Sequence, residues 1–132
     1  MSFLTQVQNE KIMKKLLVAT LVSISTLAFG QTEAFYKAVE NQDIKSITDL
    51  LMDEVELCIK DDQRIISKAT ATKTIKEFLT QINPKSVASL HSGSSGAGSK
   101  YQVGKMITGD GIYRIFVYLE GNKIQELRFD TF

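Results

Sequence analysis

Residues 101–132 read YQVGKMITGDGIYRIFVYLEGNKIQELRFDTF, and the architecture of the whole chain depends on them. Two dipeptides in this stretch, Asp110-Gly111 and Gly121-Asn122, accept the positive φ angles of tight hairpin turns. They separate three segments of strand-like composition, Tyr101–Thr108, Ile112–Leu119 and Lys123–Phe132. The stretch therefore predicts a three-stranded antiparallel meander.

One side of the middle segment is more consistently apolar than the other. Successive side chains of a strand point to opposite faces of a sheet. The odd positions of this segment are Tyr113, Ile115, Val117 and Leu119. We therefore expect these four side chains to face the core.

The last segment needs a β-bulge if its apolar side chains are to be buried together. Strict alternation after a two-residue turn would place Leu127 and Phe129 on the opposite side from Ile124. One extra residue, at Gln125 or Glu126, brings all three to the core side. Burying two more large side chains is worth roughly 3–6 kcal/mol, whereas a bulge disturbs the ladder only locally. We therefore predict the bulge.

Two aromatic residues, Phe116 and Tyr118, fall on the other side of the meander, where solvent is expected. The bulged register sets Arg114 opposite Asp130 and Phe116 opposite Arg128 on this side. An exposed Arg–Asp pair contributes at most about 1 kcal/mol, so the aromatic side chains are more informative. They are either isolated surface hydrophobic residues, which are common, or part of a patch that a partner subunit or ligand covers.

The beginning of the chain has the features of a secretory signal peptide. Two lysines precede an apolar run, residues 16–29, which ends in small side chains. Met13 is then the expected start, residues 1–30 comprise an upstream extension and the signal peptide, and residues 31–132 form a single domain. The run is shorter than the roughly 20 residues of a membrane span, and a retained N-terminal anchor is the alternative. Export would deliver the domain to the periplasm or the outside of the cell.

The expected mature domain is close to neutral. The whole chain has a net charge of +1, and the residues before Gln31, with three lysines and one glutamate, account for +2 of it. A domain of net charge −1 and mixed signs lacks the basic stripe typical of nucleic-acid-binding proteins. Because His91 is the only histidine and Cys58 the only cysteine, we expect neither a metal nor a cofactor. Cys58 is expected to be a passive thiol on a strand.

Two helices are expected before the first strands. Residues 32–40 carry Phe35, Ala38 and Val39 at helical spacing. Asp43 is the expected N-cap of a second, short helix. The apolar side of that helix comprises Ile44, Ile47, Leu50 and Leu51.

A hairpin and a long helix follow. Glu54–Lys60 alternates, with Val55, Leu57 and Ile59 inward and Cys58 outward, and Arg64–Ser67 is the return strand. Ser67 is the expected N-cap of a helix from Lys68 to about Asn83, which Pro84 ends. The single apolar stripe of this helix comprises Ala71, Ile75, Phe78, Leu79 and Ile82. We expect the helix to lie across the concave side of the sheet.

A strand at Lys85–Ser92 leads into the one low-complexity segment of the mature chain. Gly93–Lys100 approaches the composition of a phosphate-binding loop, but its lysine does not follow the last glycine and a strand follows it. We therefore expect a flexible hairpin loop. By alternation, His91 shares a side with Val87 and Ser89. It is either a general base at the mouth of a pocket or, more commonly for a lone histidine, a hydrogen-bonded structural residue.

The expected order of helix, helix, hairpin, long helix and four strands resembles the nuclear transport factor 2-like, or cystatin-like, α+β half-cone. More narrowly, the chain resembles a family of small secreted Bacteroidota proteins, domain-of-unknown-function family 4783. The resemblance rests on four pieces, His91–Ser94, Tyr101–Gly104, Gly111–Arg114 and Ile124–Leu127. It implies three helices on a curved, mostly antiparallel sheet, in the order α-α-β-β-α-β-β-β-β. It also implies an exported protein with no assigned reaction.

Three functional hypotheses follow. The first is a non-catalytic exported module that binds a small apolar ligand or a protein partner in or around the cone, with His91, Tyr101 and Tyr113 as ligand-binding residues. The second is an isomerase- or hydrolase-like enzyme that uses the same cavity. The third is a structural homodimer that is joined sheet to sheet through Phe116 and Tyr118. No residue pattern in the sequence identifies a catalytic centre.

Overall fold

A computed structural model of the chain describes residues 30–94 and 97–132. The expected signal peptide, apart from its last residue, and the expected start at Met13 lie outside these residues. Within the described ranges, no helix is both long enough and apolar enough to cross a membrane.

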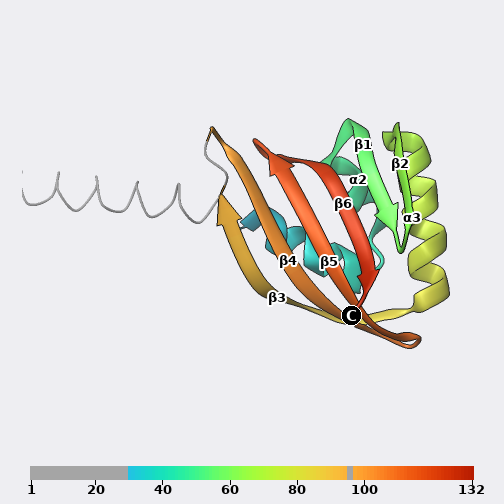
Figure 1. Cartoon of the computed structure of the whole chain (residues 1–132). Coiled ribbons are helices and arrows are strands. Elements are labelled where there is room, and N and C mark those ends of the chain that lie inside the picture. Colours follow the sequence, from blue (N-terminus) through green and yellow to red (C-terminus); the bar gives the residue numbers. More distant parts are fainter. Residues whose placement is uncertain (1–29, 95–96) are drawn as a thin grey trace, which may run out of the picture. The chain divides into compact units, whose positions relative to one another are not determined.

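The described part of the chain contains the helices and strands that the sequence predicts, in the predicted order (Figure 1). Residues 31–40 are helical, and they are followed by α2 (Ile44–Leu50) and, after a hairpin, by α3 (Lys68–Ile82). The strands are β1 (Leu51–Ile59), β2 (Asp62–Ser67), β3 (Pro84–Ser94), β4 (Ser99–Thr108), β5 (Gly111–Glu120) and β6 (Lys123–Thr131).

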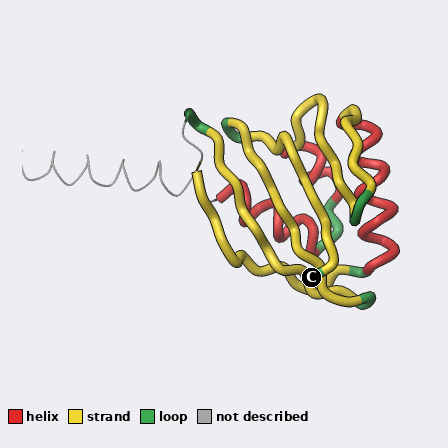
Figure 2. Tube along the Cα trace, in the orientation of Figure 1, coloured by secondary structure: helices red, strands yellow, loops and turns green. Residues whose placement is uncertain are grey.

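The six strands form one curved sheet in the order β2-β1-β6-β5-β4-β3 (Figure 2). Neighbouring strands are antiparallel except for β1 and β6, which run parallel. This parallel contact joins the first hairpin to the meander, although the two are far apart in the sequence. The helices lie on one side of the sheet, and Figure 1 looks onto the other. We call the side with the helices the inner face and the open side the outer face.

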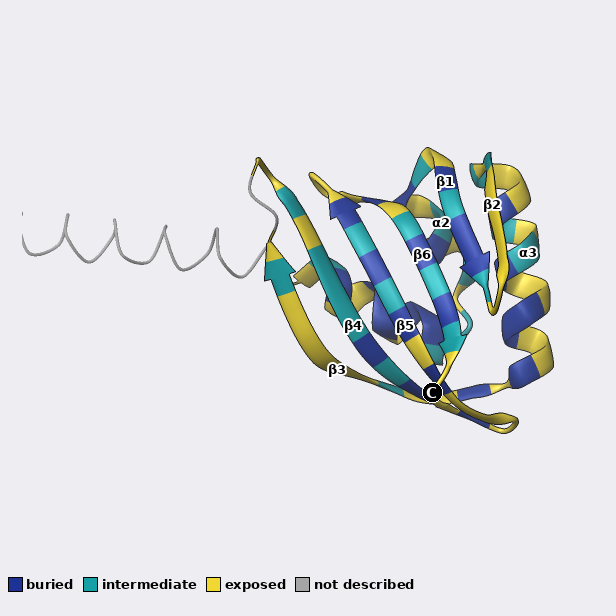
Figure 3. Ribbon diagram, viewed as in Figure 1, coloured by how far each residue is buried: buried dark blue, intermediate teal, exposed yellow. Residues whose placement is uncertain are grey.

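The meander has the predicted register. The four odd positions of β5 from Tyr113 to Leu119 are buried and the even positions are not, so that the burial alternates along the strand in Figure 3. Leu119 pairs with Ile124 and Tyr118 pairs with Glu126, which leaves Gln125 as the extra residue of a bulge. The apolar residues of β6 beyond this point are fully buried. The predicted bulge is confirmed.

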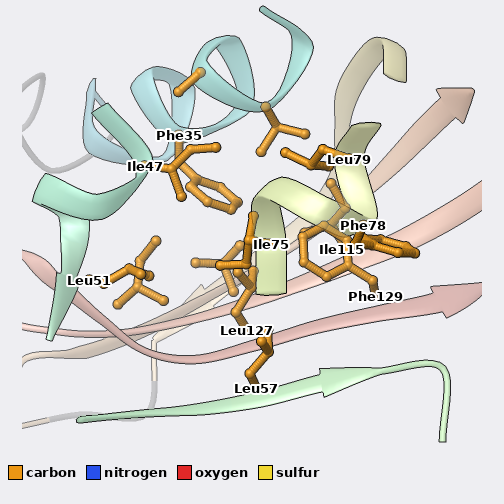
Figure 4. Packing of buried hydrophobic residues seen from close by; sticks show 14 of the residues in the cluster. Phe35, Ile47, Leu51, Leu57, Ile75, Phe78, Leu79, Ile115, Leu127 and Phe129 are labelled. Atoms are coloured by element: carbon orange, nitrogen blue, oxygen red, sulfur yellow. The ribbon is translucent and has the colours of Figure 1, made fainter. Parts of the chain in front are cut away.

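Helix α3 closes the core over the inner face. Its N-cap is Ser67, as predicted, and Asn83 ends it in a left-handed conformation. The five residues of the predicted apolar stripe are all buried. Phe78 packs edge-on against Tyr113, with ring centroids 5.7 Å apart. The Phe78 ring also lies 5.1 Å from that of Phe129, and Figure 4 shows these two residues side by side. The chain's own aromatic side chains therefore occupy the space beneath α3.

Two local expectations differ from the structure. Leu51, expected on α2, instead begins β1 and is fully buried there. The expected flexible loop is shorter than the glycine-rich segment, because β3 and β4 both extend into it. Gly93 pairs with Tyr101 and Ser94 with Lys100, so both ends of the segment belong to the ladder. Small side chains do not prevent ladder pairing when the neighbouring strand supplies the partners.

Candidate binding surface

A second bulge determines which face His91 occupies. The register of β3 against β4 skips Leu90, which lies between Ser89 and His91. The extra residue reverses the alternation, so His91 pairs with Val103 and lies on the outer face. The prediction that His91 shares a side with Val87 and Ser89 is therefore wrong. Ser89, Leu90 and His91 are all exposed, so the pairing with the bulge and the pairing without it bury the same side chains. The sequence therefore contains no signal for this bulge.

On the outer face, His91 meets aromatic residues from the two neighbouring strands. Its Nε2 lies 3.3 Å from the Tyr101 hydroxyl, and the two rings are 5.8 Å apart. The Tyr101 ring stacks on Phe116, with centroids 6.1 Å apart and planes inclined by 25°. Tyr118 is directly opposite Tyr101 in the ladder. We call His91, Tyr101, Phe116 and Tyr118 the aromatic cluster.

Gly93 makes room for this cluster. A Cβ atom at position 93 would lie 2.6 Å from the Tyr101 ring, which is closer than any van der Waals contact. The absence of a side chain therefore lets the ring of Tyr101 lie across β3, where it reaches His91. The structure thus brings together four of the five residues that the sequence singled out for ligand binding or an interface.

A second apolar group occupies the other end of the outer face. Ile107 and Ile112 are paired across β4 and β5, and the backbone N–H of Phe132 donates to the Ile112 carbonyl. Their exposed fractions are 44%, 42% and 61%, respectively. We call these three residues the terminal patch. We did not predict this patch from the sequence, although Ile112 has the same alternation phase as Phe116 and therefore indicates the same face.

A charged row separates the two apolar groups. It comprises Lys105, Arg114 and Asp130 on three neighbouring strands. The Lys105 ammonium and the Arg114 guanidinium lie over the Phe132 ring, at 5.5 Å and 5.4 Å from its centroid. Arg114 and Asp130 are directly opposite each other, as predicted. The described part of the chain nevertheless contains no ion pair between them.

Cys58 lies on the outer side of β1, as expected, but it is covered. The residue is only 3% exposed, and its thiol donates a hydrogen bond to the Lys60 carbonyl. Burial raises the pKa of the thiol, and the adjacent Arg128 opposes this shift. A thiol that is buried and largely protonated is a poor nucleophile, which agrees with the expectation of a passive residue.

The structure separates Tyr113 from the other two residues expected to bind a ligand. Tyr113 lies on the inner face and is 3% exposed. Its hydroxyl donates to the Asp110 carboxylate at 3.1 Å, and burial together with this carboxylate raises its pKa. His91 and Tyr101 lie on the opposite face of the sheet. The three residues therefore do not form one site.

The inner face holds two buried polar atoms for which the described residues provide no hydrogen-bond partner, the Tyr36 hydroxyl and Gln102 Oε1. The Tyr36 hydroxyl packs against Gly104, where a Cβ atom would be only 2.7 Å away. Burial raises the pKa of Tyr36 to about 12, so this hydroxyl is a neutral donor at physiological pH. Sequence reasoning did not identify the pair, because Tyr36 and Gln102 are brought to the same face only by packing of the first helix on β4.

Two surface hollows can be described, and neither contains a residue of the aromatic cluster. One, of about 300 Å³, lies between the helix at 31–40 and α2, and the other, of about 450 Å³, lies where β1 meets the start of α3. In the described ranges, no three His, Cys, Asp or Glu side chains are grouped so that they could hold a metal ion.

A six-stranded sheet of this order with its helices on one face defines the class of nuclear transport factor 2-like proteins. Such a protein of unknown function from Cytophaga hutchinsonii matches with a TM-score of 0.57 at 10% identity, over 75% of this chain and 84% of that chain. A candidate ketosteroid isomerase from Kribbella flavida matches with a TM-score of 0.59 at 11% identity, over 76% of this chain and 74% of that one. At these identities the likeness shows the fold alone.

The family is narrower than the fold. Residues 32–130 match the model of the family described as "Domain of unknown function (DUF4783)", so the chain belongs to this family. A solved DUF4783 protein from Bacteroides ovatus has a TM-score of 0.70 to this chain at 20% identity, and the match covers 75% of this chain and 93% of that one. No curated protein matches the sequence.

Proposed function

We propose that the chain is a non-catalytic binding module that engages its partner through the outer face of the sheet. The observation that carries the proposal is the composition of this face. The aromatic cluster and the terminal patch both lie on the side that the helices leave open. The terminal patch is exposed, and the rings of Tyr101, Phe116 and Tyr118 are half-buried. Apolar groups that reach solvent together on one face are typical of a binding surface.

The packing of the inner face favours binding outside the cone. A small apolar ligand beneath α3 would need the space that Phe78, Tyr113 and Phe129 fill with mutual ring contacts. To open this space, the protein would have to expose or rearrange rings that are at most 7% exposed. Breaking such packing costs several kcal/mol, about 3–5 for the loss of one buried phenylalanine.

An isomerase- or hydrolase-like activity on the inner face is the second candidate. It is favoured by the Tyr36 hydroxyl, a buried neutral donor without a partner among the described residues. Such a donor could stabilise an oxyanion, but the reaction also needs a base. His91 cannot supply it from the outer face. We therefore favour a binding function over a catalytic one.

We further propose that the mature domain is exported. The support is the basic, apolar and small-residue pattern that precedes Gln31. N-terminal sequencing of the protein from the periplasmic or extracellular fraction of a Bacteroides host tests this. A first residue close to Gln31 is expected, and an intact N-terminus in the cytoplasmic fraction would contradict it.

Site-specific photocrosslinking tests the binding surface. A benzophenone amino acid is introduced into the full chain at Ile112 or at Tyr118, on the outer face, and at Lys76 as a control, since Lys76 is exposed on α3. After irradiation of intact cells, mass spectrometry separates adducts with a small ligand, a second copy or another protein. We expect a discrete adduct from positions 112 and 118 and none from position 76. Absence of adducts on the outer face, or equal adducts at position 76, would refute the proposal.

A further inference from the structure

Between the level of Tyr101 and the level of Ile107, the outer face of β4 and β5 carries charge of one sign only. The charged groups there are the Lys105 ammonium and the Arg114 guanidinium, which we call the cation pair. The two residues are directly opposite each other in the ladder, an arrangement in which like charges repel. Both groups lie over the Phe132 ring, and this contact offsets only part of the repulsion.

The cation pair is not neutralised within the described part of the chain. Asp130 is directly opposite Arg114 on β6, but no described carboxylate lies within ion-pair distance of either cation. Farther along β6 the situation differs, because Arg128 forms an ion pair of 3.6 Å with Glu126. An acidic group of another molecule can therefore compensate the charge of the cation pair.

Apolar side chains lie on both sides of the cation pair along the strands. The neighbouring level on one side holds Val103 and Phe116, and the neighbouring level on the other side holds Ile107 and Ile112. Each level is two residues from the next, which is a distance of about 6.8 Å along a strand. The face therefore presents apolar, cationic and apolar levels at a regular spacing.

We propose that the outer face of β4 and β5 binds an extended segment of another protein, in which an acidic residue has an apolar residue two positions before it and another two positions after it. The proposal rests on the binding function proposed above and names its partner. Every second side chain of an extended segment points the same way, about 6.8 Å from the last. This is the spacing of the levels on β4 and β5.

An acidic side chain over the cation pair places its two apolar neighbours over the apolar levels. One neighbour then lies over Phe116 and the other over Ile112. The pattern is the same when it is read in either chain direction, so it applies whichever way the segment runs along the strands.

The shape of the face favours a segment over a small ligand. A small ligand needs a concave site that covers most of its surface, and the two surface hollows described above contain no residue of this face. A segment that follows the strands from the level of Tyr101 to that of Ile107 is about 20 Å long. It buries much less than the roughly 800 Å² per partner of a standard interface, so we expect weak, reversible binding.

Peptide selection tests the pattern. A phage-displayed library of random peptides is selected against the purified chain and, in parallel, against the variant Lys105→Glu/Arg114→Glu. Peptides selected by the wild type should carry Asp or Glu with a large apolar residue two positions before and two positions after it. The variant should select Lys or Arg at the same place and keep the apolar neighbours, because only the charge of the surface has changed.

Fluorescence anisotropy with one selected, labelled peptide measures the contribution of the two cations. In Lys105→Gln/Arg114→Gln the dissociation constant should rise at least about tenfold, and the remaining binding should lose the salt dependence of the wild type. Lys73→Gln/Lys76→Gln is the matched control, since it removes two positive charges from the exposed side of α3. It should change the dissociation constant by less than about twofold.

A change in the peptide completes the comparison. When its acidic residue is replaced by the corresponding amide, the peptide should bind the wild type and Lys105→Gln/Arg114→Gln with the same affinity, because the carboxylate and the cations are lost from one interaction. Circular dichroism confirms the fold of each variant.

The outcomes separate this inference from the proposed function. Acidic peptides selected by the wild type and basic ones selected by the reversed variant support it. The absence of selected peptides overturns it, and so does an acidic residue that the reversed variant still selects. If positions 112 and 118 then crosslink to a second copy or to a small ligand, the extended partner is wrong while the outer face remains the binding surface. If those positions give no adduct either, the proposed function fails as well.

Discussion

Replacement of Tyr36 by phenylalanine should not destabilise the protein, although the side chain is almost completely buried. The hydroxyl has no hydrogen-bond partner among the described residues. A buried hydroxyl in this state costs about 1–3 kcal/mol relative to its hydration in the unfolded chain. Phenylalanine keeps the ring and its contacts. The free energy of unfolding should therefore stay the same or rise by up to about 2 kcal/mol.

The contact between Tyr36 and Gly104 allows a double-mutant cycle. In Gly104→Ala, the new Cβ would lie 2.7 Å from the Tyr36 hydroxyl oxygen and 2.8 Å from the ring carbon that bears it. Overpacking of this kind costs about 1–3 kcal/mol, and alanine recovers about 0.5–1 kcal/mol of the flexibility that glycine has in the unfolded chain. A net loss of up to about 2.5 kcal/mol is expected.

The two changes should be coupled. In the Tyr36→Phe background the oxygen is gone, but the ring carbon at 2.8 Å remains. The cost of Gly104→Ala should therefore fall by at least about 0.5 kcal/mol without vanishing.

Urea unfolding of the four proteins, followed by circular dichroism, measures these differences. Tyr101→Phe is the matched control, since the hydroxyl of Tyr101 has a partner in His91 and its loss should cost about 0.5–1 kcal/mol. A loss of more than about 1 kcal/mol in Tyr36→Phe would refute the reasoning, because it would show that the hydroxyl has a partner in solution. Additive effects in the cycle would refute the contact with Gly104.

Three other predictions concern single residues. Phe78→Ala should cost about 3–5 kcal/mol of unfolding free energy, measured in the same assay, because its ring fills the space beneath α3. Cys58 should react with a thiol reagent only as the protein unfolds, since burial raises the pKa of the thiol; rapid labelling of the folded chain would contradict this. Burial and, secondly, the Glu56 carboxylate raise the pKa of Glu126, so the folded state holds this proton more tightly and the contribution of Glu126 to stability declines as pH rises through its folded pKa. Glu126→Gln should therefore be at least as stable as the wild type at neutral pH, with an advantage that shrinks at acidic pH; an advantage that grows on acidification would show the opposite shift.

Burial explains why the meander could be predicted in such detail. A register slip of one residue at β6 would expose Leu127 and Phe129, which are fully buried, and the energetic penalty is several kcal/mol. The bulge at Gln125 follows from that penalty alone. At Leu90 the corresponding penalty is absent, because the residues around it are exposed. Alternation therefore placed His91 on the wrong face.

The aromatic cluster could be predicted only in parts. The alternation of β5 already placed Phe116 and Tyr118 away from the core, but the sequence could not show that Tyr101 lies on Phe116. That contact depends on the pairing of β4 with β5 and on the space above Gly93. The terminal patch likewise requires Ile107 and Ile112 to meet at the end of a hairpin.

The sequence alone determines the elements, their order and the core side of β1, β5, β6 and α3. Helix caps, turn dipeptides and apolar periodicity act over a few residues, and the burial energy at these positions is large. The sequence also specifies that α3 is amphipathic and that β6 is bulged. Only the tertiary structure decides that β1 pairs in parallel with β6, that His91 lies among the outer aromatic residues, and that the Tyr36 hydroxyl is buried against Gly104. Each of these features depends on residues that are far apart in the chain. The local energies of the alternative arrangements are nearly equal, so long-range packing decides between them.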